Sequence, residues 1–158
     1  MRMGIGYDIH RLAEERKLIL AGVEIPYVKG LISFTDGDVV LHAIADAILG
    51  GLAMGDIGLH FPNTDPKLKE LPSSEIVKKV LEMADSKNYR VNNVDTIIIA
   101  EEPKIYPFRG KMIDALSGLL KIDKDRINIK ATTNEGVGSL GRGDAIAAYA
   151  VVTLEEKK

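Results

Sequence analysis

The chain has 158 residues, enough for one compact domain with a sizeable core. Its net charge of −2 indicates no general attraction to nucleic acid or to an anionic membrane. No run of about 20 apolar residues is present to span a bilayer, and no signal-peptide pattern is found, so we expect a cytoplasmic protein. The lack of cysteine excludes disulfides and thiolate zinc sites, so a transition-metal site must use His, Asp or Glu.

The first elements follow from alternation, turn residues and helical periodicity. Apolar residues alternate with glycine and Asp over residues 5–9, which predicts a half-buried strand. Short apolar runs at 18–20 and 23–25 indicate a hairpin. A helix capped by Asp36 or Asp38 is expected to run to about residue 54, and to be buried because it is apolar nearly all round.

Residues 55–72 are rich in Gly, Pro, Asp and Asn, which predicts a long loop of the kind that is usually functional or disordered. The remaining elements are expected in this order: a helix capped by Ser73 or Ser74, a strand over 94–100, a helix opened by Pro107, a strand over 127–132, a loop with four glycines between 134 and 144, and a last strand over 146–154. This mixture favours a single-domain α/β or α+β fold, with a mixed β-sheet and helices packed on one face.

Asp8 and His10 form the first candidate site. Side chains alternate between the two faces of a strand, so these two point the same way. A carboxylate and an imidazole that converge on one point suit Zn²⁺ or a similar ion. An ordinary surface Asp and His at the end of a strand is the alternative.

His42 is the second candidate, because an imidazole within an apolar helix must be satisfied by some partner. A core histidine bonded to a carbonyl is the ordinary explanation. Asp46 lies one turn later, and a carboxylate bonded to the far nitrogen of a histidine is common at metal sites. Asp8, His10 and His42 would then make a three-ligand site with an open fourth position; a closed structural site is the alternative. His60, in the loop, is interpreted as incidental.

Two polar segments are further candidates. Residues 130–135 run from a strand into the glycine-rich loop, where N–H groups, hydroxyls and a carboxylate can hold phosphate and a hard cation such as Mg²⁺. Arg142, between two glycines, adds a guanidinium suited to phosphate. Polar groups at 56–58 and 61–65 lie on a loop able to fold over a ligand. For the glycine-rich segment, an ordinary glycine turn is the alternative.

The order of the motifs is more specific than their spacing. Along nearly its whole length the chain carries GYDIHR, TDGDVVLHAIADAILG, GDIGLHFPNTD, EEPKIYP and KATTNEGVGSLGRGDAIAAYAV. These motifs resemble the 2-C-methyl-D-erythritol 2,4-cyclodiphosphate synthase family. The resemblance implies a homotrimer in the non-mevalonate isoprenoid pathway with active sites between subunits. In its reaction, the 2-phosphate of 4-diphosphocytidyl-2-C-methyl-D-erythritol 2-phosphate attacks the β-phosphorus and cytidine monophosphate leaves.

The resemblance also implies roles for individual residues. Asp8, His10 and His42 resemble ligands of Zn²⁺ or another divalent ion. Glu135 matches a position that helps to hold Mg²⁺ or Mn²⁺ at the diphosphate, and Thr133 matches a hydroxyl that stabilises the transition state. The substrate contacts that it implies are Asp8, His10, Phe34, Thr35, Asp56, Ile57, Gly58, Phe61, Pro62, Asn63, Thr64, Asp65, Ala100, Glu101, Glu102, Pro103, Lys104, Ile105, Tyr106, Thr132, Thr133, Asn134, Glu135, Ser139 and Arg142.

Within that set, Thr132 and residues 100–106 resemble the pocket for cytidine diphosphate, and residues 61–65 resemble the part that covers the erythritol. The family often has His-Ser where this chain has Phe34-Thr35. Phe34 stands at a position expected to be catalytic, yet it cannot donate a hydrogen bond. Thr35 keeps the hydroxyl.

Two other functions use the same residues. A zinc-dependent hydrolase of nucleotide diphosphates would use metal-bound water as its nucleophile. A non-enzymatic trimeric binding module would use the metal only to hold the fold.

Overall fold

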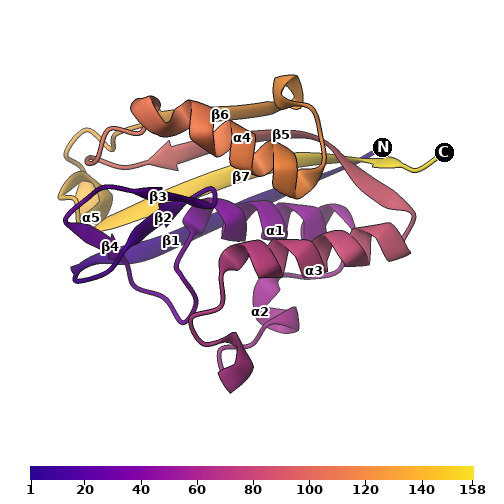
Figure 1. The fold of residues 1–158 in the computed structure, drawn as a ribbon, viewed down its shortest axis with the longest axis horizontal. Helices are drawn as coiled ribbons and strands as arrows, with labels where there is room; N and C mark the ends of the chain where they lie inside the picture. The colour runs from indigo at the N-terminus through magenta and orange to yellow at the C-terminus, as the bar shows by residue number, and fades with distance from the viewer.

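The computed structural model describes all of residues 1–158 (Figure 1). None of its helices has the length and apolar character needed to cross a membrane. Its strands, α-helices and short 3₁₀ helices (η) are, in chain order, β1 (Arg2–Glu14), β2 (Leu18–Leu20), β3 (Val23–Ile25), β4 (Lys29–Leu31), α1 (Val39–Gly51), α2 (Ile57–His60), η1 (Pro66–Leu68), α3 (Ser73–Ser86), β5 (Tyr89–Ile99), η2 (Tyr106–Phe108), α4 (Arg109–Leu120), η3 (Lys124–Arg126), β6 (Ile127–Thr132), α5 (Gly138–Gly141) and β7 (Ala145–Glu156).

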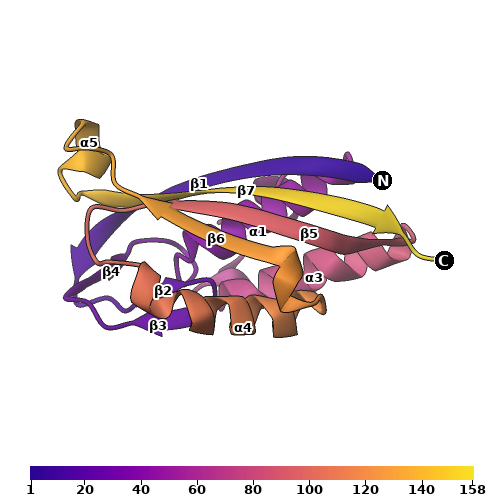
Figure 2. The same cartoon turned by 90° about the horizontal axis from the view of Figure 1, so that it is seen from above.

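Five strands form one mixed sheet in the order β4-β1-β7-β5-β6, in which β5 and β6 are the parallel pair. The strands β2 and β3 form the predicted hairpin. Figure 2 shows α1, α3, α4 and the hairpin on one side of the sheet. The two termini lie together at the end of the sheet away from α5 (Figure 1). The predicted mixed α/β fold with helices on one face is therefore confirmed.

The helix α1 comes closest to the sheet at two glycines of β1. A Cβ at Gly4 would lie 1.8 Å from the carbonyl oxygen of Ala47, and one at Gly6 would lie 1.9 Å from that of Ala43. A residue with a side chain would therefore push the helix away. Because strand side chains alternate, the residues that follow on this face are Asp8 and those at every second position after it.

The predicted strand over residues 5–9 is correct in its period, and the structure shows which face is buried. Ile5, Tyr7 and Ile9 point away from α1 and are exposed in the single chain, Ile5 by 68%. The ring of Tyr7 lies beside that of Tyr149 on the neighbouring strand β7, with centroids 4.6 Å apart. The glycines face the helix because the close contact there leaves no room for apolar side chains, so an apolar surface remains on the outer face.

The structure confirms one of the two predicted caps of α1, and it differs from the predictions at both long loops and at the start of α3. Asp38 is the residue that caps α1, and its carboxylate also accepts from the N–H groups of Ala21 and Gly22, which ties the hairpin to the helix. The loop over 55–72 contains α2 and η1, and the glycine-rich loop contains α5. The prediction that Ser73 or Ser74 caps α3 is wrong: Pro72 precedes the helix without a side-chain cap, and Ser73 is buried with other partners.

Candidate metal centre and active site

Asp8, His10 and His42 meet on the face of β1 that α1 covers. Asp8 Oδ2 lies 3.0 Å from His10 Nε2 and 2.9 Å from His42 Nδ1. The two ring nitrogens are 3.3 Å apart. The alternation of β1 places Asp8 and His10 on this face. The close approach of α1 brings His42 to them, although it lies 32 residues beyond His10 in the chain.

The geometry of this cluster fits a divalent ion. Donor atoms bonded at about 2.0–2.1 Å to a tetrahedral zinc ion lie roughly 3.3 Å from one another. The three separations of 2.9, 3.0 and 3.3 Å are close to that value. One carboxylate oxygen and two imidazole nitrogens are a donor set that zinc accepts. The cluster can therefore hold a metal ion through three protein ligands.

The charges around the cluster also favour a cation. Burial lowers the pKa of His42, but the hydrogen bond to Asp8 and the charges of nearby carboxylates outweigh it, so the net pKa is raised. Burial raises the pKa of Asp8, but its hydrogen bonds with His10 and His42 outweigh it, so the net pKa is lowered. The site thus stabilises an ionised carboxylate and draws positive charge to it.

The far nitrogen of His42 has partners other than the predicted one. His42 Nε2 lies 2.8 Å from Ser73 Oγ and 3.2 Å from Thr35 Oγ1. Asp46 accepts instead from the backbone N–H of Ile57 at 2.7 Å. The predicted Asp46–His42 bond is therefore wrong. A carboxylate one helical turn after a histidine can bond to any donor that the fold brings near it. Here Asp46 bonds to the backbone N–H of Ile57 instead of to His42.

A cavity of about 410 Å³ opens beside the metal cluster. The cavity joins the end of β1, the segment before α1 and the loop that contains α2. Its lining residues are Asp8, His10, Ser33, Phe34, Thr35, His42, Ile57, Gly58, Phe61, Asn63 and Ile76. Four predicted contacts of the same loop lie outside that lining: Asp56, Pro62, Thr64 and Asp65.

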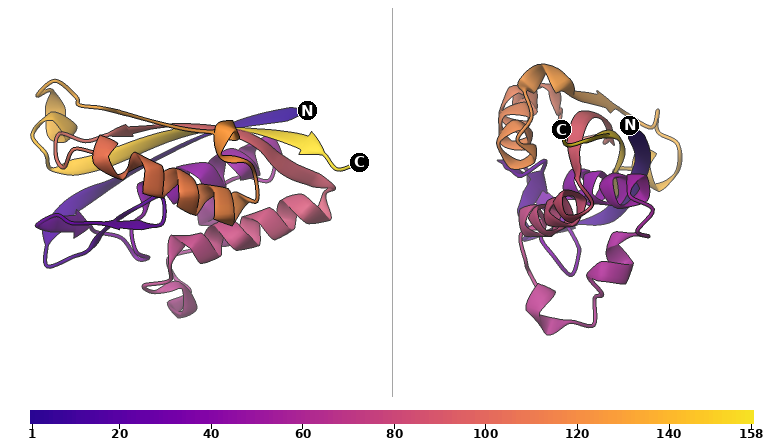
Figure 3. Two further views of the ribbon diagram at one scale, coloured as in Figure 1. Left: turned by 45° about the horizontal axis from the view of Figure 1, so that its top comes forward. Right: turned by 90° about the vertical axis from the view of Figure 1, so that its right-hand side faces the viewer.

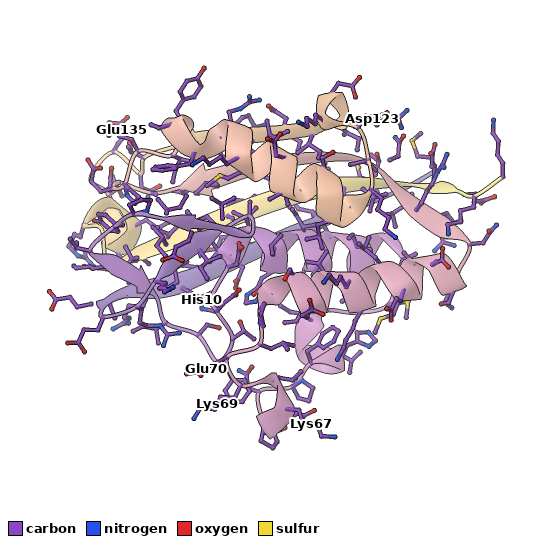
Figure 4. The ribbon with its side chains drawn as sticks, in the orientation of Figure 1. His10, Lys67, Lys69, Glu70, Asp123 and Glu135 are labelled. Atoms are coloured by element: carbon purple, nitrogen blue, oxygen red, sulfur yellow. The ribbon has the colours of Figure 1, made fainter.

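The loop over 55–72 is ordered by its own caps. Asp56 accepts from Leu59 N at 2.9 Å and so caps α2. His60 contacts the carbonyl oxygen of Met54 at 2.7 Å and stays out of the metal cluster, as predicted. Figure 3 shows this segment projecting beyond α1 and α3. Figure 4 labels Lys67, Lys69 and Glu70 on its outer part.

The remaining predicted contacts form a second polar region, which does not line the cavity. Residues 100–106 and 132–142 follow the ends of the parallel neighbours β5 and β6, so they lie at one edge of the sheet. Glu101 Oε1 accepts from Gly136 N at 2.9 Å, which joins the two segments. In the view of Figure 4, Glu135 and His10 lie on opposite sides of the hairpin.

Most of this second region is open to solvent. Thr132, Glu135, Ser139 and Arg142 are exposed. Glu135 has a left-handed backbone with φ of 51°, and its N–H donates to Thr133 Oγ1 at 3.3 Å. Its carboxylate has no hydrogen bond or ion pair within the chain. The region offers hydroxyls, N–H groups and a free carboxylate to a ligand that comes from outside.

The sequence interpretation missed three residues at the cavity: Ser33 and Ile76 in its lining, and Ser73 behind His42. Ile76 follows the apolar stripe of α3 and so carries no separate signal. Ser73 stands at the start of a helix, where serine is typical of a cap. No pattern within one segment could have shown that it reaches His42.

Comparison with known proteins agrees with this architecture. The model of the YgbB family matches residues 1–155. The chain belongs to the YgbB family. Among its relatives, the 2-C-methyl-D-erythritol 2,4-cyclodiphosphate synthase of Geobacter metallireducens is 54% identical over 157 residues, which are 99% of this chain and 100% of that protein. The synthase of Geotalea uraniireducens is 52% identical over the same shares.

Two solved structures are similar to this chain in fold and in sequence. A 2-C-methyl-D-erythritol 2,4-cyclodiphosphate synthase in a CDP-bound form matches with a TM-score of 0.91 and 34% identity, over 98% of this chain and 100% of that one. The bifunctional IspDF of Campylobacter jejuni matches with a TM-score of 0.94 and 38% identity, over 98% of this chain and 42% of that longer chain. The family resemblance predicted from the motifs is therefore confirmed.

Proposed function

We propose that this member of the YgbB family is a cytoplasmic cyclase with one catalytic domain over residues 1–158. It converts 4-diphosphocytidyl-2-C-methyl-D-erythritol 2-phosphate into 2-C-methyl-D-erythritol 2,4-cyclodiphosphate and cytidine monophosphate, in the non-mevalonate isoprenoid pathway. The observation that carries the proposal is the Asp8–His10–His42 cluster beside a cavity of about 410 Å³. The relatives named above carry the synthase name over the whole length of the chain.

Asp8, His10 and His42 would hold Zn²⁺ or another divalent ion, and Glu135 would help to hold Mg²⁺ or Mn²⁺ at the substrate diphosphate. Bound there, such ions supply positive charge that offsets the repulsion between the attacking and leaving phosphates. The support for the first ion is the spacing of its three donor atoms. The support for the second is the exposed carboxylate of Glu135 beside the Thr133 hydroxyl.

Ring closure needs no catalytic base, because the attacking phosphate oxygen is already ionised near neutral pH. That oxygen bonds to the β-phosphorus while the bond to the bridging oxygen breaks, and cytidine monophosphate leaves with the bridging oxygen. The residues of the chain therefore hold one folded conformer with the two phosphates in line. Thr133 donates to the charge that develops, and residues 61–65 cover the erythritol and exclude water.

The substrate's nucleotide end belongs to the second polar region. Thr132 and residues 100–106 would hold the cytidine diphosphate, with Tyr106 82% exposed and free to contact a ligand. In one chain this region stands apart from the cavity that the metal cluster lines. A substrate that contacts both regions is best accommodated if each comes from a different subunit.

We therefore propose a homotrimer with active sites between neighbouring subunits. The outer face of β1 and β7 supports this assembly, because Met3, Ile5 and Tyr7 are 70%, 68% and 45% exposed in one chain. Exposed apolar patches of this kind mark interfaces. Arg142 would lie near the trimer axis. Sedimentation or light scattering that gives a monomer at working concentration would contradict the shared site.

The hydrolase alternative differs in the fate of water. In ring closure no solvent oxygen enters either product, whereas a hydrolase places one water oxygen on a phosphorus. We expect turnover of the substrate in ¹⁸O-water to give unlabelled cytidine monophosphate and unlabelled cyclodiphosphate by mass spectrometry. Label that tracks turnover would favour the hydrolase. No turnover at all, with a fold that melts when zinc is removed, would favour a binding module.

A further inference from the structure

Ser73 lies behind the metal cluster, against the nitrogen of His42 that faces away from Asp8. It is 0% exposed, although it is the first residue of α3. Its hydroxyl oxygen lies 2.8 Å from His42 Nε2 and is hydrogen-bonded to Asp36 Oδ1. Its backbone N–H donates to Asp36 Oδ2 at 3.0 Å. Ser73 is therefore held at two points by one carboxylate while it touches a metal ligand.

The direction of these hydrogen bonds follows from counting protons. An ionised carboxylate only accepts, and a serine hydroxyl has one proton to give. The proton of Ser73 is therefore donated to Asp36, and its oxygen is left as an acceptor toward His42. His42 Nε2 must then carry the hydrogen. Without a metal, Nδ1 carries a hydrogen as well, which it donates to the Asp8 carboxylate 2.9 Å away. When a metal ion replaces that hydrogen, Nδ1 offers its lone pair to the ion beside Asp8 and His10, while Nε2 keeps its hydrogen for Ser73.

The surrounding backbone keeps this chain of hydrogen bonds in place. Glu70 N donates to Phe34 O at 2.8 Å, and Asp36 N lies 3.4 Å from Leu71 O. Asp36 Oδ1 also accepts from Asp38 N at 3.1 Å. The segment before α1 and the segment before α3 are thus joined by several bonds, so Ser73 cannot move away from His42 without breaking them.

We infer that Ser73, oriented by Asp36, is a positioning residue that fixes the tautomer and ring orientation of His42, so that Nδ1 faces the metal. The inference rests on the proposed metal site and adds two residues that do not touch the ion. Thr35 Oγ1, 3.2 Å from Nε2, is a second and weaker acceptor for the same proton. Groups that orient a ligating histidine in this way typically change metal affinity by about 10–100-fold when they are removed.

The test is the zinc affinity of the purified full chain, measured by competition with a chromophoric chelator. Ser73→Ala is expected to weaken zinc binding by about 10–100-fold. Ser74→Ala is the matched control, because it removes the same hydroxyl one residue later, where no hydrogen bond to His42 exists, and it should bind zinc as the wild type does. An affinity for Ser73→Ala within about threefold of the wild type would overturn the inference, since it lies well below the usual effect.

A second variant tests which atom carries the hydrogen between Ser73 and His42. It keeps the inference testable if Ser73→Ala fails to fold. In Asp36→Asn the amide can donate to Ser73, whose own proton then turns toward His42 Nε2. Nε2 must then accept, so it cannot carry the hydrogen that a neutral imidazole needs there when a metal binds Nδ1. We expect weaker zinc binding again, and ¹⁵N NMR of the metal-free protein should show a hydrogen on His42 Nε2 in the wild type that is absent in Asp36→Asn. A hydrogen that stays on Nε2, together with unchanged zinc affinity, would overturn the inference. If the wild type bound no zinc at all, the proposed metal site itself would be wrong, and the role of Ser73 with it.

Discussion

The metal cluster and the Thr133–Glu135 segment are both polar, but they are organised by different means. The cluster is supplied by the long strand β1 and the buried helix α1, and His42 is only 4% exposed. Glu135 lies on an exposed turn that is held by local hydrogen bonds. The first region is preorganised by the core of its own chain. The second presents its groups to solvent, and we propose that a neighbouring subunit and the substrate complete it.

The largest effect is expected from removing a ligand of the preorganised region. His42→Ala should lose the tightly bound zinc, which metal analysis of the purified protein measures. Turnover should fall roughly 10³-fold or more, because a bound ion contributes several kcal/mol and about 1.4 kcal/mol is tenfold in rate. His60→Ala is the control and should keep its zinc. Unchanged zinc content in His42→Ala would remove His42 from the site.

The second-largest effect is expected from a change that lies in neither the metal cluster nor the Thr133–Glu135 segment but disrupts the contact between subunits. Ile5→Lys places a charge in the proposed interface, where desolvation costs several kcal/mol for each chain. Light scattering should show monomers, and turnover should fall with the fraction of trimer while each chain keeps its zinc. Leu59→Lys, at another exposed apolar position, should leave the mass of the assembly unchanged. A fully active monomer would refute the division of the site between subunits.

A smaller effect is expected from the open region. Glu135→Gln keeps the shape of the side chain but removes its charge, so it should weaken the second cation and lower turnover by about 10²-fold. Zinc content should not change, since the cluster of the same chain does not include Glu135. Titration with Mg²⁺ or Mn²⁺ during turnover measures the effect, and an equal loss of zinc would show that the two regions are not independent.

The smallest effect is expected at Phe34, which lines the cavity, at a position where the family resemblance of the motifs implies a hydrogen-bond donor. Removal of a preformed donor typically costs about 10²–10³ in rate, so Thr35 and the metal ions are expected to offset its absence here. Phe34→His should leave turnover similar or faster. A large drop in steady-state turnover would instead show that the packing of Phe34 is required.

Local patterns predicted the parts of the site that local structure determines. Alternation along a strand was enough to place Asp8 and His10 on one face, and a lone imidazole in an apolar helix was enough to single out His42. The partner of His42 was predicted wrongly because the i,i+4 argument sees one helix only. Ser73 reaches His42 through the packing of α3 against α1, which no segment specifies alone.

The strand pattern also could not show which face of β1 is buried. Periodicity indicates only that the two faces of a strand differ in polarity, and apolar residues such as Ile5 and Tyr7 would ordinarily face the core. In this fold, glycines at positions 4 and 6 admit the helix, and the apolar face is left outside. Likewise, the order of motifs along the chain did not reveal that the contacts divide into two separate regions.

The contact between β1 and α1 has a consequence for changes in chain length. Gly4 faces Ala47 and Gly6 faces Ala43, and the two spacings match because two strand residues rise about 6.6 Å and four helical residues rise about 6 Å. One residue inserted between Gly6 and Asp8 would turn both strand ligands to the outer face, beside Ile5. Insertions are therefore expected to be tolerated in the outer part of the loop, over residues 66–69, which contributes no predicted substrate contact and does not line the cavity. They are expected to be excluded between Gly4 and His10, whatever residue is added.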